Sequence, residues 1–312
     1  MDKHAARIAV GYDGSESAGT ALDWAAAQAE RHNLPLSVVT VVDYVGMLPG
    51  VYGPSSPTLF QEEAKEIAER GEQRARKSAA SIDIITEPAV GQVAENLIRL
   101  SASADRLVVG NRGHGEVSGT LLGSVGFAVS AHAHCPVVVV RGDTTAPGPQ
   151  RPVMVGVDDS PGARAALRYA ADRAAEAGAP LIVATTYRLV SPQVWAEYGP
   201  YYGEATAEAP TYDAMARENA AKVASAAAQQ ATEQHPNLTV RESVSTGSPA
   251  HELVRNAGNC ALLVVGTRGH GGFAGLLLGS VSHDVIHSAP CPVAIIPTEE
   301  QTPPSGQSDS DR

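Results

Sequence analysis

The sequence predicts a doubly wound α/β fold that occurs twice in a chain of 312 residues. Short apolar runs, many of them rich in valine, alternate with longer segments in which apolar residues recur every three or four positions. This alternation is typical of parallel strands that helices cover on both faces, and right-handed crossovers would make each sheet Rossmann-like. Because the same order of segments appears twice, we expect two tandem domains of ordinary size.

Each element of the first copy has its own signal. The first strand-like run ends shortly before Asp13, and Ser15 or Ser17 can cap the helix that follows. The other runs have the length and the composition of buried strands, and the segments between them carry apolar stripes at helical spacing. The expected strands are residues 8–11, 36–42, 82–86, 106–110 and 136–141. The expected helices are residues 15 or 17 to 30, 58–80, 93–101 and 123–131.

Equivalent residues show how the two copies are related. Asp13 corresponds to Asp158, and Cys135 corresponds to Cys291, so the offset grows from 145 to 156 residues. We place the extra residues within 191–211, either as an ordered lid or interface loop or as a mobile surface loop. The expected division of the chain is a first domain at 1–146, a second domain at 147–298 and a polar, disordered tail at 299–312.

The composition argues against several classes of binding partner and against a place in a membrane. The net charge is −11 and no basic patch is visible, which argues against partners such as nucleic acid or anionic membranes. No window is apolar enough to span a membrane and no signal peptide is recognisable, so we expect a cytoplasmic protein. The three cysteines lack C-x-x-C spacing and are expected to be small buried residues beside strands.

One glycine pattern occurs in both copies. Gly110-Asn111-Arg112-Gly113 is followed after nine residues by Gly123-Ser124, and Gly266-Thr267-Arg268-Gly269 is followed at the same spacing by Gly279-Ser280. Glycines let the backbone approach a ligand closely. A helix that begins at the Gly-Ser pair would point its first amides and the positive end of its dipole at the same ligand. The pattern predicts one bound phosphate per repeat, although a tight turn without a ligand would use the same glycines.

Charged residues lie at the same predicted edge of each sheet. Asp13 and Asp158 end the first strands, where a carboxylate suits ribose hydroxyls or an adenine edge, or simply forms a turn. Arg112 and Arg268 either neutralise phosphate or face solvent. The sequence contains no Gly-Lys dipeptide, so it has no Walker A loop, and no clean G-x-G-x-x-G follows the first strand.

Histidines follow both glycine loops. His114 and His270 are either ligand contacts or ordinary polar loop residues, and they lack the spacing and the partner acids of a zinc site. We assign no catalytic residue and no metal ligand.

These residues together carry a family resemblance. Asp13 after an apolar strand, the glycine pattern that ends in Ser124, and Cys135-Pro136 before a run of valines resemble a universal stress protein domain. The second copy is similar in the same way, and the tandem arrangement resembles actinobacterial members. The resemblance implies, for each domain, a five-stranded parallel sheet in the order 3-2-1-4-5, of the adenine nucleotide alpha hydrolase-like type. It also implies one ATP per domain, and two domains paired like a homodimer of single-domain members.

The resemblance also implies which residues hold ATP. In the first domain they are Gly11, Asp13, Val41, Gly110, Arg112, Gly113, Gly123, Ser124 and Val125. In the second domain they are Gly156, Asp158, Thr186, Gly266, Arg268, Gly269, Gly279, Ser280 and Val281. Thr186 replaces an apolar residue at the adenine wall and Asp159 replaces Gly14, so we expect the two sites to differ in affinity.

Four functions follow from this pattern. The first is a regulatory ATP-binding protein of stress or dormancy adaptation, in which Mg²⁺ balances the phosphate charge. Binding of ATP would change how the protein pairs with an unknown protein partner or with a second copy in a homodimer. The second is a slow ATPase, although no repeated carboxylate lies close to the phosphate loops to orient water. The third is a protein that binds cyclic nucleotides such as cAMP, and the fourth is an interaction module without a ligand.

Overall fold

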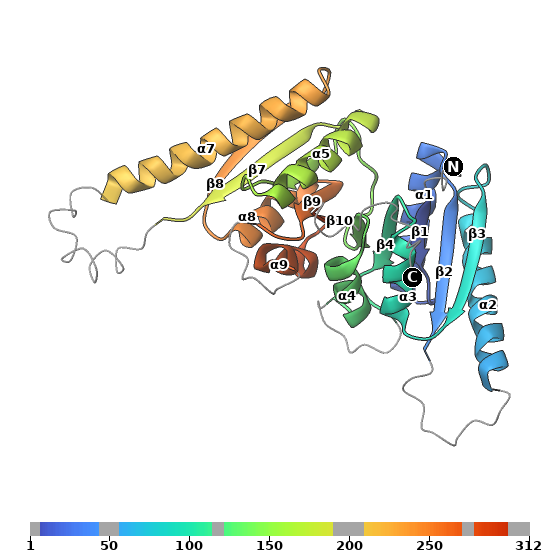
Figure 1. Ribbon diagram of the computed structural model, residues 1–312. Coiled ribbons are helices and arrows are strands. Elements are labelled where there is room, and N and C mark those ends of the chain that lie inside the picture. Colours follow the sequence, from blue (N-terminus) through green and yellow to red (C-terminus); the bar gives the residue numbers. More distant parts are fainter. Residues whose placement is uncertain (1–6, 44–55, 114–121, 190–208, 270–277, 299–312) are drawn as a thin grey trace, which may run out of the picture. The chain divides into compact units, whose positions relative to one another are not determined.

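The computed structural model describes residues 7–43, 56–113, 122–189, 209–269 and 278–298 (Figure 1). The chain forms two compact units. The first contains residues 1–144 together with 292–312, and the second contains residues 145–291. The histidines His114 and His270, the insertion at 191–208 and the tail at 299–312 lie outside the described residues.

The first unit contains a parallel sheet in the order β3-β2-β1-β4-β5. Its helices cover the sheet in two pairs, since α1 contacts α2 and α3 contacts α4, and α2 runs along β2 and β3 (Figure 1). The strands are β1 (Ile8–Gly11), β2 (Leu36–Val42), β3 (Ile84–Val90), β4 (Arg106–Gly110) and β5 (Val137–Val140). The helices are α1 (Glu16–His32), α2 (Ser56–Ala75), α3 (Val93–Ser101) and α4 (Ser124–His132).

The second unit repeats this arrangement with parallel strands in the order β9-β6-β7-β8. The long helix α7 lies along β7 and β8 (Figure 1). The strands are β6 (Val153–Gly156), β7 (Leu181–Tyr187), β8 (Val240–Thr246) and β9 (Leu262–Gly266). The helices are α5 (Pro161–Glu176), α7 (Ala209–Gln234), α8 (Pro249–Asn256), the short 3-10 helix Ala257–Asn259 and α9 (Ser280–Ser288).

The last strand of the chain, β10 (Val293–Ile296), belongs by its contacts to the first unit. It pairs antiparallel with β5, with Val293 opposite Val139 and Ile295 opposite Val137. The predicted fold class of tandem Rossmann-like α/β domains is confirmed, with the complete parallel order 3-2-1-4-5 in the first unit and the order 3-2-1-4 among the strands of the second unit. The antiparallel pairing of β10 adds a contact that the strand–helix alternation does not reveal.

Serine caps fix the start of the first helix in each unit. Ser15 Oγ accepts a hydrogen bond from the amide of Ala18 at 3.2 Å, and Ser160 Oγ accepts one from Ala163 at 3.1 Å. Each bond satisfies an amide that the first helical turn would otherwise leave unpaired. Of the two serines expected to cap α1, Ser15 is therefore the cap.

Two predicted boundaries move in the structure. The third strand begins at Ile84 and continues to Val90, because residues 84–90 pair in register with β2. Pro88 lies inside this strand, which a strand paired on one side tolerates, since its missing amide donor can face away from β2. The helix expected over 58–80 is α2, which ends at Ala75.

The cores consist of strand valines and helix alanines, and all three cysteines are buried in them. Cys135, Cys260 and Cys291 are 5%, 1% and 1% exposed, and none forms a disulfide. Their expected role as small buried residues agrees with this placement. Among the described helices, none is both long and apolar enough to cross a bilayer.

We predict that the thiols of the folded protein react slowly with thiol reagents at mildly alkaline pH. Burial raises the pKa of Cys135 to about 12 and that of Cys260 to about 11. Because the thiolate is the reactive form, both should react slowly with a disulfide reagent at pH 8 and should react promptly after unfolding in urea. Prompt reaction of either thiol in the folded protein would contradict the burial.

The same raised pKa values predict how stability depends on pH. An unfolded cysteine has a pKa near 9.0, so the contribution of Cys260 to the free energy of unfolding is complete below that pH and is lost as the pH rises toward about 11. Urea denaturation measures the free energy of unfolding at pH 8 and at pH 10. Between these two pH values, Cys260→Ala should lose less of this free energy than the wild type.

Candidate nucleotide site

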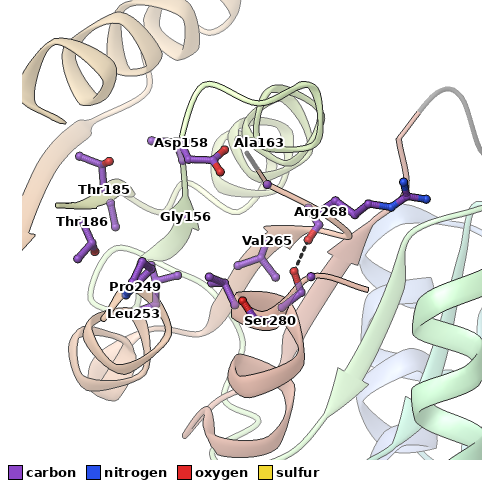
Figure 2. Close-up of a pocket in the computed structure, with 17 residues that line it drawn as sticks. Gly156, Asp158, Ala163, Thr185, Thr186, Pro249, Leu253, Val265, Arg268 and Ser280 are labelled. Carbon is purple, nitrogen blue, oxygen red and sulfur yellow. Dashed lines mark hydrogen bonds between the residues drawn. The ribbon is translucent and has the colours of Figure 1, made fainter. Parts of the chain in front are cut away.

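Each unit contains one pocket at the carboxyl ends of its first, second and fourth parallel strands. Its volume is about 390 Å³ in the first unit and about 160 Å³ in the second. The first pocket is lined by all nine residues predicted for it, which are Gly11, Asp13, Val41, Gly110, Arg112, Gly113, Gly123, Ser124 and Val125. The second is likewise lined by Gly156, Asp158, Thr186, Gly266, Arg268, Gly269, Gly279, Ser280 and Val281 (Figure 2).

The first glycine of each motif permits a close contact between a strand and a helix. A Cβ atom on Gly110 would lie 2.5 Å from Ser17 Oγ and 2.8 Å from the Ser17 carbonyl carbon. A Cβ atom on Gly266 would lie 2.7 Å from the carbonyl carbon of Gly162. Real Cβ atoms do not approach backbone this closely, so only glycine allows the fourth strand to end against the first turn of α1 or α5.

The second glycine of each motif faces the aspartate of the first strand. A Cβ atom on Gly113 would lie 2.8 Å from Asp13 Oδ2, and one on Gly269 would meet Asp158 Oδ2 even more closely. The other carboxylate oxygen belongs to a turn, because Asp13 Oδ1 accepts a hydrogen bond from Ser15 N at 2.9 Å. One oxygen of this side chain therefore forms the turn, as one of the two interpretations expected, while the other oxygen faces the glycine loop, and its contact with a ligand stays a prediction.

The helices α4 and α9 begin at the pockets. Gly123 and Gly279 are their N-cap residues, with extended backbone and without a side-chain cap. The amide of Gly123 donates to the carbonyl of Asn111 at 3.0 Å, which joins the helix start to the first glycine loop. Because Ser124 and Val125 line the pocket, the first-turn amides and the positive end of the helix dipole lie beside it.

A polar clamp fixes the glycine loop of the first unit. Ser17 Oγ donates to Asn111 Oδ1 at 2.7 Å and accepts a hydrogen bond from the Arg112 amide at 3.2 Å. Both partners of this clamp differ in the second unit, where Gly162 and Thr267 occupy the equivalent positions. The Thr267 hydroxyl is buried there and has no hydrogen-bond partner among the described residues.

The second unit keeps the turn after its first strand despite a different residue. Asp159 has φ 65°, in the same left-handed region as Gly14 with φ 87°. Aspartate tolerates this region better than most residues, and Arg164 Nη1 pairs with Asp159 Oδ1 at 3.1 Å. The replacement of Gly14 by Asp159 therefore leaves the local backbone course unchanged.

The side chains predicted to line the second pocket point in different directions. Asp158, Thr185 and Thr186 lie on one side of the pocket, and Ser280 lies on the other (Figure 2). The guanidinium of Arg268 extends away from these side chains (Figure 2). Arg268 thus borders the pocket without aiming its charge into it in this structure.

Helix residues complete both pockets, and the motif analysis did not find them. Leu97 of α3 and Leu253 of α8 occupy equivalent positions and line the two pockets, as Val93 and Pro249 do one turn earlier. Their apolar i,i+4 spacing at the start of each third helix was a usable signal. Also missed were Tyr12, Thr40, Asp43 and Ile67 in the first unit and Ala163, Thr185 and Val265 in the second.

Comparison with known proteins identifies the family. The sequence matches the universal stress protein family over residues 5–141 and 150–297, once per repeat. The chain belongs to the universal stress protein family. This finding confirms the resemblance drawn from the glycine pattern.

Relatives of this universal stress protein match it over almost their whole length. One from Mycolicibacterium smegmatis is 34% identical over 299 residues, which cover 93% of this chain and 96% of the relative. Another, from Mycobacterium tuberculosis, is 32% identical over 315 residues, which cover 95% and 97%. The crystal structure of a universal stress protein from Archaeoglobus fulgidus has the same fold, with a TM-score of 0.67 and 21% identity over 95% of this chain and 97% of its own.

The close approach at Gly266 predicts a stability effect in this universal stress protein. Gly266→Ala should lower the free energy of unfolding by about 1–3 kcal/mol, because the added Cβ meets the backbone of α5. Urea denaturation measures the loss. Gly258→Ala is the matched control, since a Cβ there has nothing within 4 Å, and it should change stability by less than about 0.5 kcal/mol. Equal midpoints for the two variants would contradict the packing argument.

The Ser17 clamp predicts a local change in dynamics. Ser17→Ala removes a hydrogen bond worth about 1 kcal/mol, so the Arg112 amide should exchange with solvent roughly fivefold faster. Hydrogen exchange followed by NMR measures this rate. Thr20→Ala, on the same helix, is the control because Thr20 Oγ1 bonds only within the helix in the contacts described. Unchanged exchange at Arg112 in Ser17→Ala would show that the clamp does not restrain the loop.

Proposed function

We propose that this universal stress protein is a regulatory protein that binds ATP in each of its two pockets. One observation carries the proposal: in both units a glycine loop, a helix N-terminus and the carboxylate of the first strand border a single pocket. The glycine loop and the helix start suit an anionic phosphate chain, and the carboxylate suits hydroxyl or amine donors. The arrangement thus has a phosphate end and a nucleoside end.

The residues of the first pocket fit an adenine nucleotide. Val39, Val41 and Leu97 supply apolar contacts for a flat base, and Asp13 Oδ2 can accept hydrogen bonds from ribose hydroxyls. Ser124 and the first amides of α4 can donate to phosphate oxygens. A volume of about 390 Å³ falls in the range of about 300–1,000 Å³ that is typical of small-molecule sites.

The second pocket fits the same ligand less well. Its volume of about 160 Å³ is below that range, and its base wall carries the hydroxyl of Thr186 where the first pocket has Val41. This hydroxyl needs a polar partner when a ligand covers it, which an apolar wall does not require. We therefore propose that the first pocket binds ATP more tightly than the second.

Mg²⁺ would be bound mainly by the phosphates of ATP. Among the described residues, no group of three or more His, Cys, Asp and Glu side chains is arranged to hold a metal ion. Mg²⁺ usually keeps several waters and uses substrate phosphates with only one or two carboxylates. In a chain of net charge −11, the ion would also reduce the repulsion between the protein and the triphosphate.

We assign the pockets to regulation. Phosphoryl transfer needs a group that positions the attacking water and a cation that stabilises the transition state. In this proposal Asp13 lies at the nucleoside end of the pocket, and Arg268 extends away from the second pocket, so neither is placed for that task. Binding of ATP would instead order the glycine loops and change the surface that a protein partner contacts.

Thermal unfolding with nucleotides tests the proposal. Micromolar affinity corresponds to about −8 kcal/mol, and ATP at about 100 times its dissociation constant should stabilise the fold by about 2.7 kcal/mol. The midpoint should therefore rise by several degrees with Mg²⁺ and ATP. No shift with ATP, ADP or AMP would overturn the proposal, and displacement of ATP by cAMP at lower concentration would reassign the ligand.

Calorimetry with matched variants assigns the two sites. Ser124→Ala should weaken the tighter site about tenfold, because it removes one hydrogen bond to a charged phosphate, and Ser280→Ala should act on the weaker site. Thr20→Ala, outside both pockets, should bind ATP like the wild type. Identical titrations for all four proteins would show that the hydroxyls of Ser124 and Ser280 do not bind the phosphate.

A further inference from the structure

The helices α4 and α9 are equivalent in the duplication, but one face of α9 has changed in character. Both helices begin with the same pair, Ser124-Val125 and Ser280-Val281. In α4 the next positions of this face carry Phe127, Ala128 and Ala131, none of which ligates metals. In α9 the same positions carry His283, Asp284 and His287. Three side chains with metal-binding chemistry thus occur together in one repeat.

The two histidines are arranged as a pair. They are four residues apart on α9, so they project from the same face of the helix. Their ring centroids are 4.5 Å apart and their planes are tilted by 51°. The two rings therefore lie close enough together for rotation of the side chains to bring one nitrogen of each to a shared ion, at metal–nitrogen distances of about 2.0–2.1 Å.

Asp284 orients one of the rings. Its Oδ1 lies 3.1 Å from His283 Nδ1, and the His283 side chain is 46% exposed. A proton on Nδ1 that is donated to this carboxylate leaves Nε2 as the basic nitrogen, which is the usual outer-shell arrangement of histidine ligands. His287 lies in the last turn of α9, where the negative end of the helix dipole favours a cation.

We propose that His283 and His287 form a binding site for a divalent transition metal of the imidazole-preferring class, with water in the remaining coordination positions. Zn²⁺ is the probe of choice because imidazole nitrogens suit it and because it has no redox chemistry. Asp284 acts as a positioning residue that fixes the tautomer of His283. The site is separate from the nucleotide pockets, since neither histidine lines one.

Zinc titration of the full chain by calorimetry, after treatment with a chelator, tests the site. The variants His283→Phe and His287→Ala introduce the residues of α4 at these two positions, and each should weaken Zn²⁺ binding at least tenfold. Asp284→Ala should weaken it about tenfold, as removal of an outer-shell partner does at metal sites. His251→Gln is the matched control, because His251 is an exposed histidine on another helix of the same unit, and it should leave the titration unchanged.

Spectroscopy of the histidine rings separates coordination from a change in folding. In nitrogen-detected NMR of the wild type, Zn²⁺ should shift the Nε2 resonance of His283, and the resonance of His251 should stay in place. Circular dichroism should show the same helix content in all variants, because the substituted face is solvent-accessible at His283. Equal Zn²⁺ affinity of the wild type and the His283→Phe/His287→Ala double variant would overturn the proposal.

Discussion

The contact between the end of the fourth strand and the first turn of the first helix determines the geometry of both sites. Gly110 meets Ser17, and Gly266 meets Gly162, at distances that leave no room for a Cβ atom. Because the strand ends there, the loop that follows is brought against the aspartate of the first strand. The helix that begins at Gly123 or Gly279 is then tied back to that loop by a backbone hydrogen bond. The pocket is thus a consequence of how strand and helix pack.

Much of this arrangement was predictable because it depends on local signals. Valine-rich runs and helical stripes predict the parallel sheets, and the duplicated glycines predict where each pocket lies. Less predictable were features that depend on long-range pairing. The third strand extends to Val90 through Pro88, because its register with β2 outweighs the local preference of proline. The sequence left open whether Arg268 neutralises phosphate or faces solvent; its guanidinium extends away from the other pocket side chains (Figure 2), and no sequence pattern reports the direction of a long side chain.

The two repeats keep the same framework and differ in the groups attached to it. The backbone turn after the first strand is the same whether Gly14 or Asp159 forms it. The polar clamp of Ser17 and Asn111 in the first unit has no equivalent in the second, where Gly162 and Thr267 stand. The first pocket has Val41 at its wall, and the second has Thr186 at the equivalent position. Duplication has therefore preserved the packing constraints while the side chains that set affinity and surface chemistry have diverged.

The place of β10 has a consequence for biosynthesis. This strand follows the whole second unit in the sequence, yet its contacts group it with the unit that is made first. During translation, β5 is present with its outer valines long before Val293–Ile296 emerge to pair with it. The first unit can fold its five parallel strands early, but one edge of its sheet stays open until the ribosome has made residues 293–296. An exposed valine-rich edge is a template for pairing with other chains, so the nascent protein needs protection over that interval.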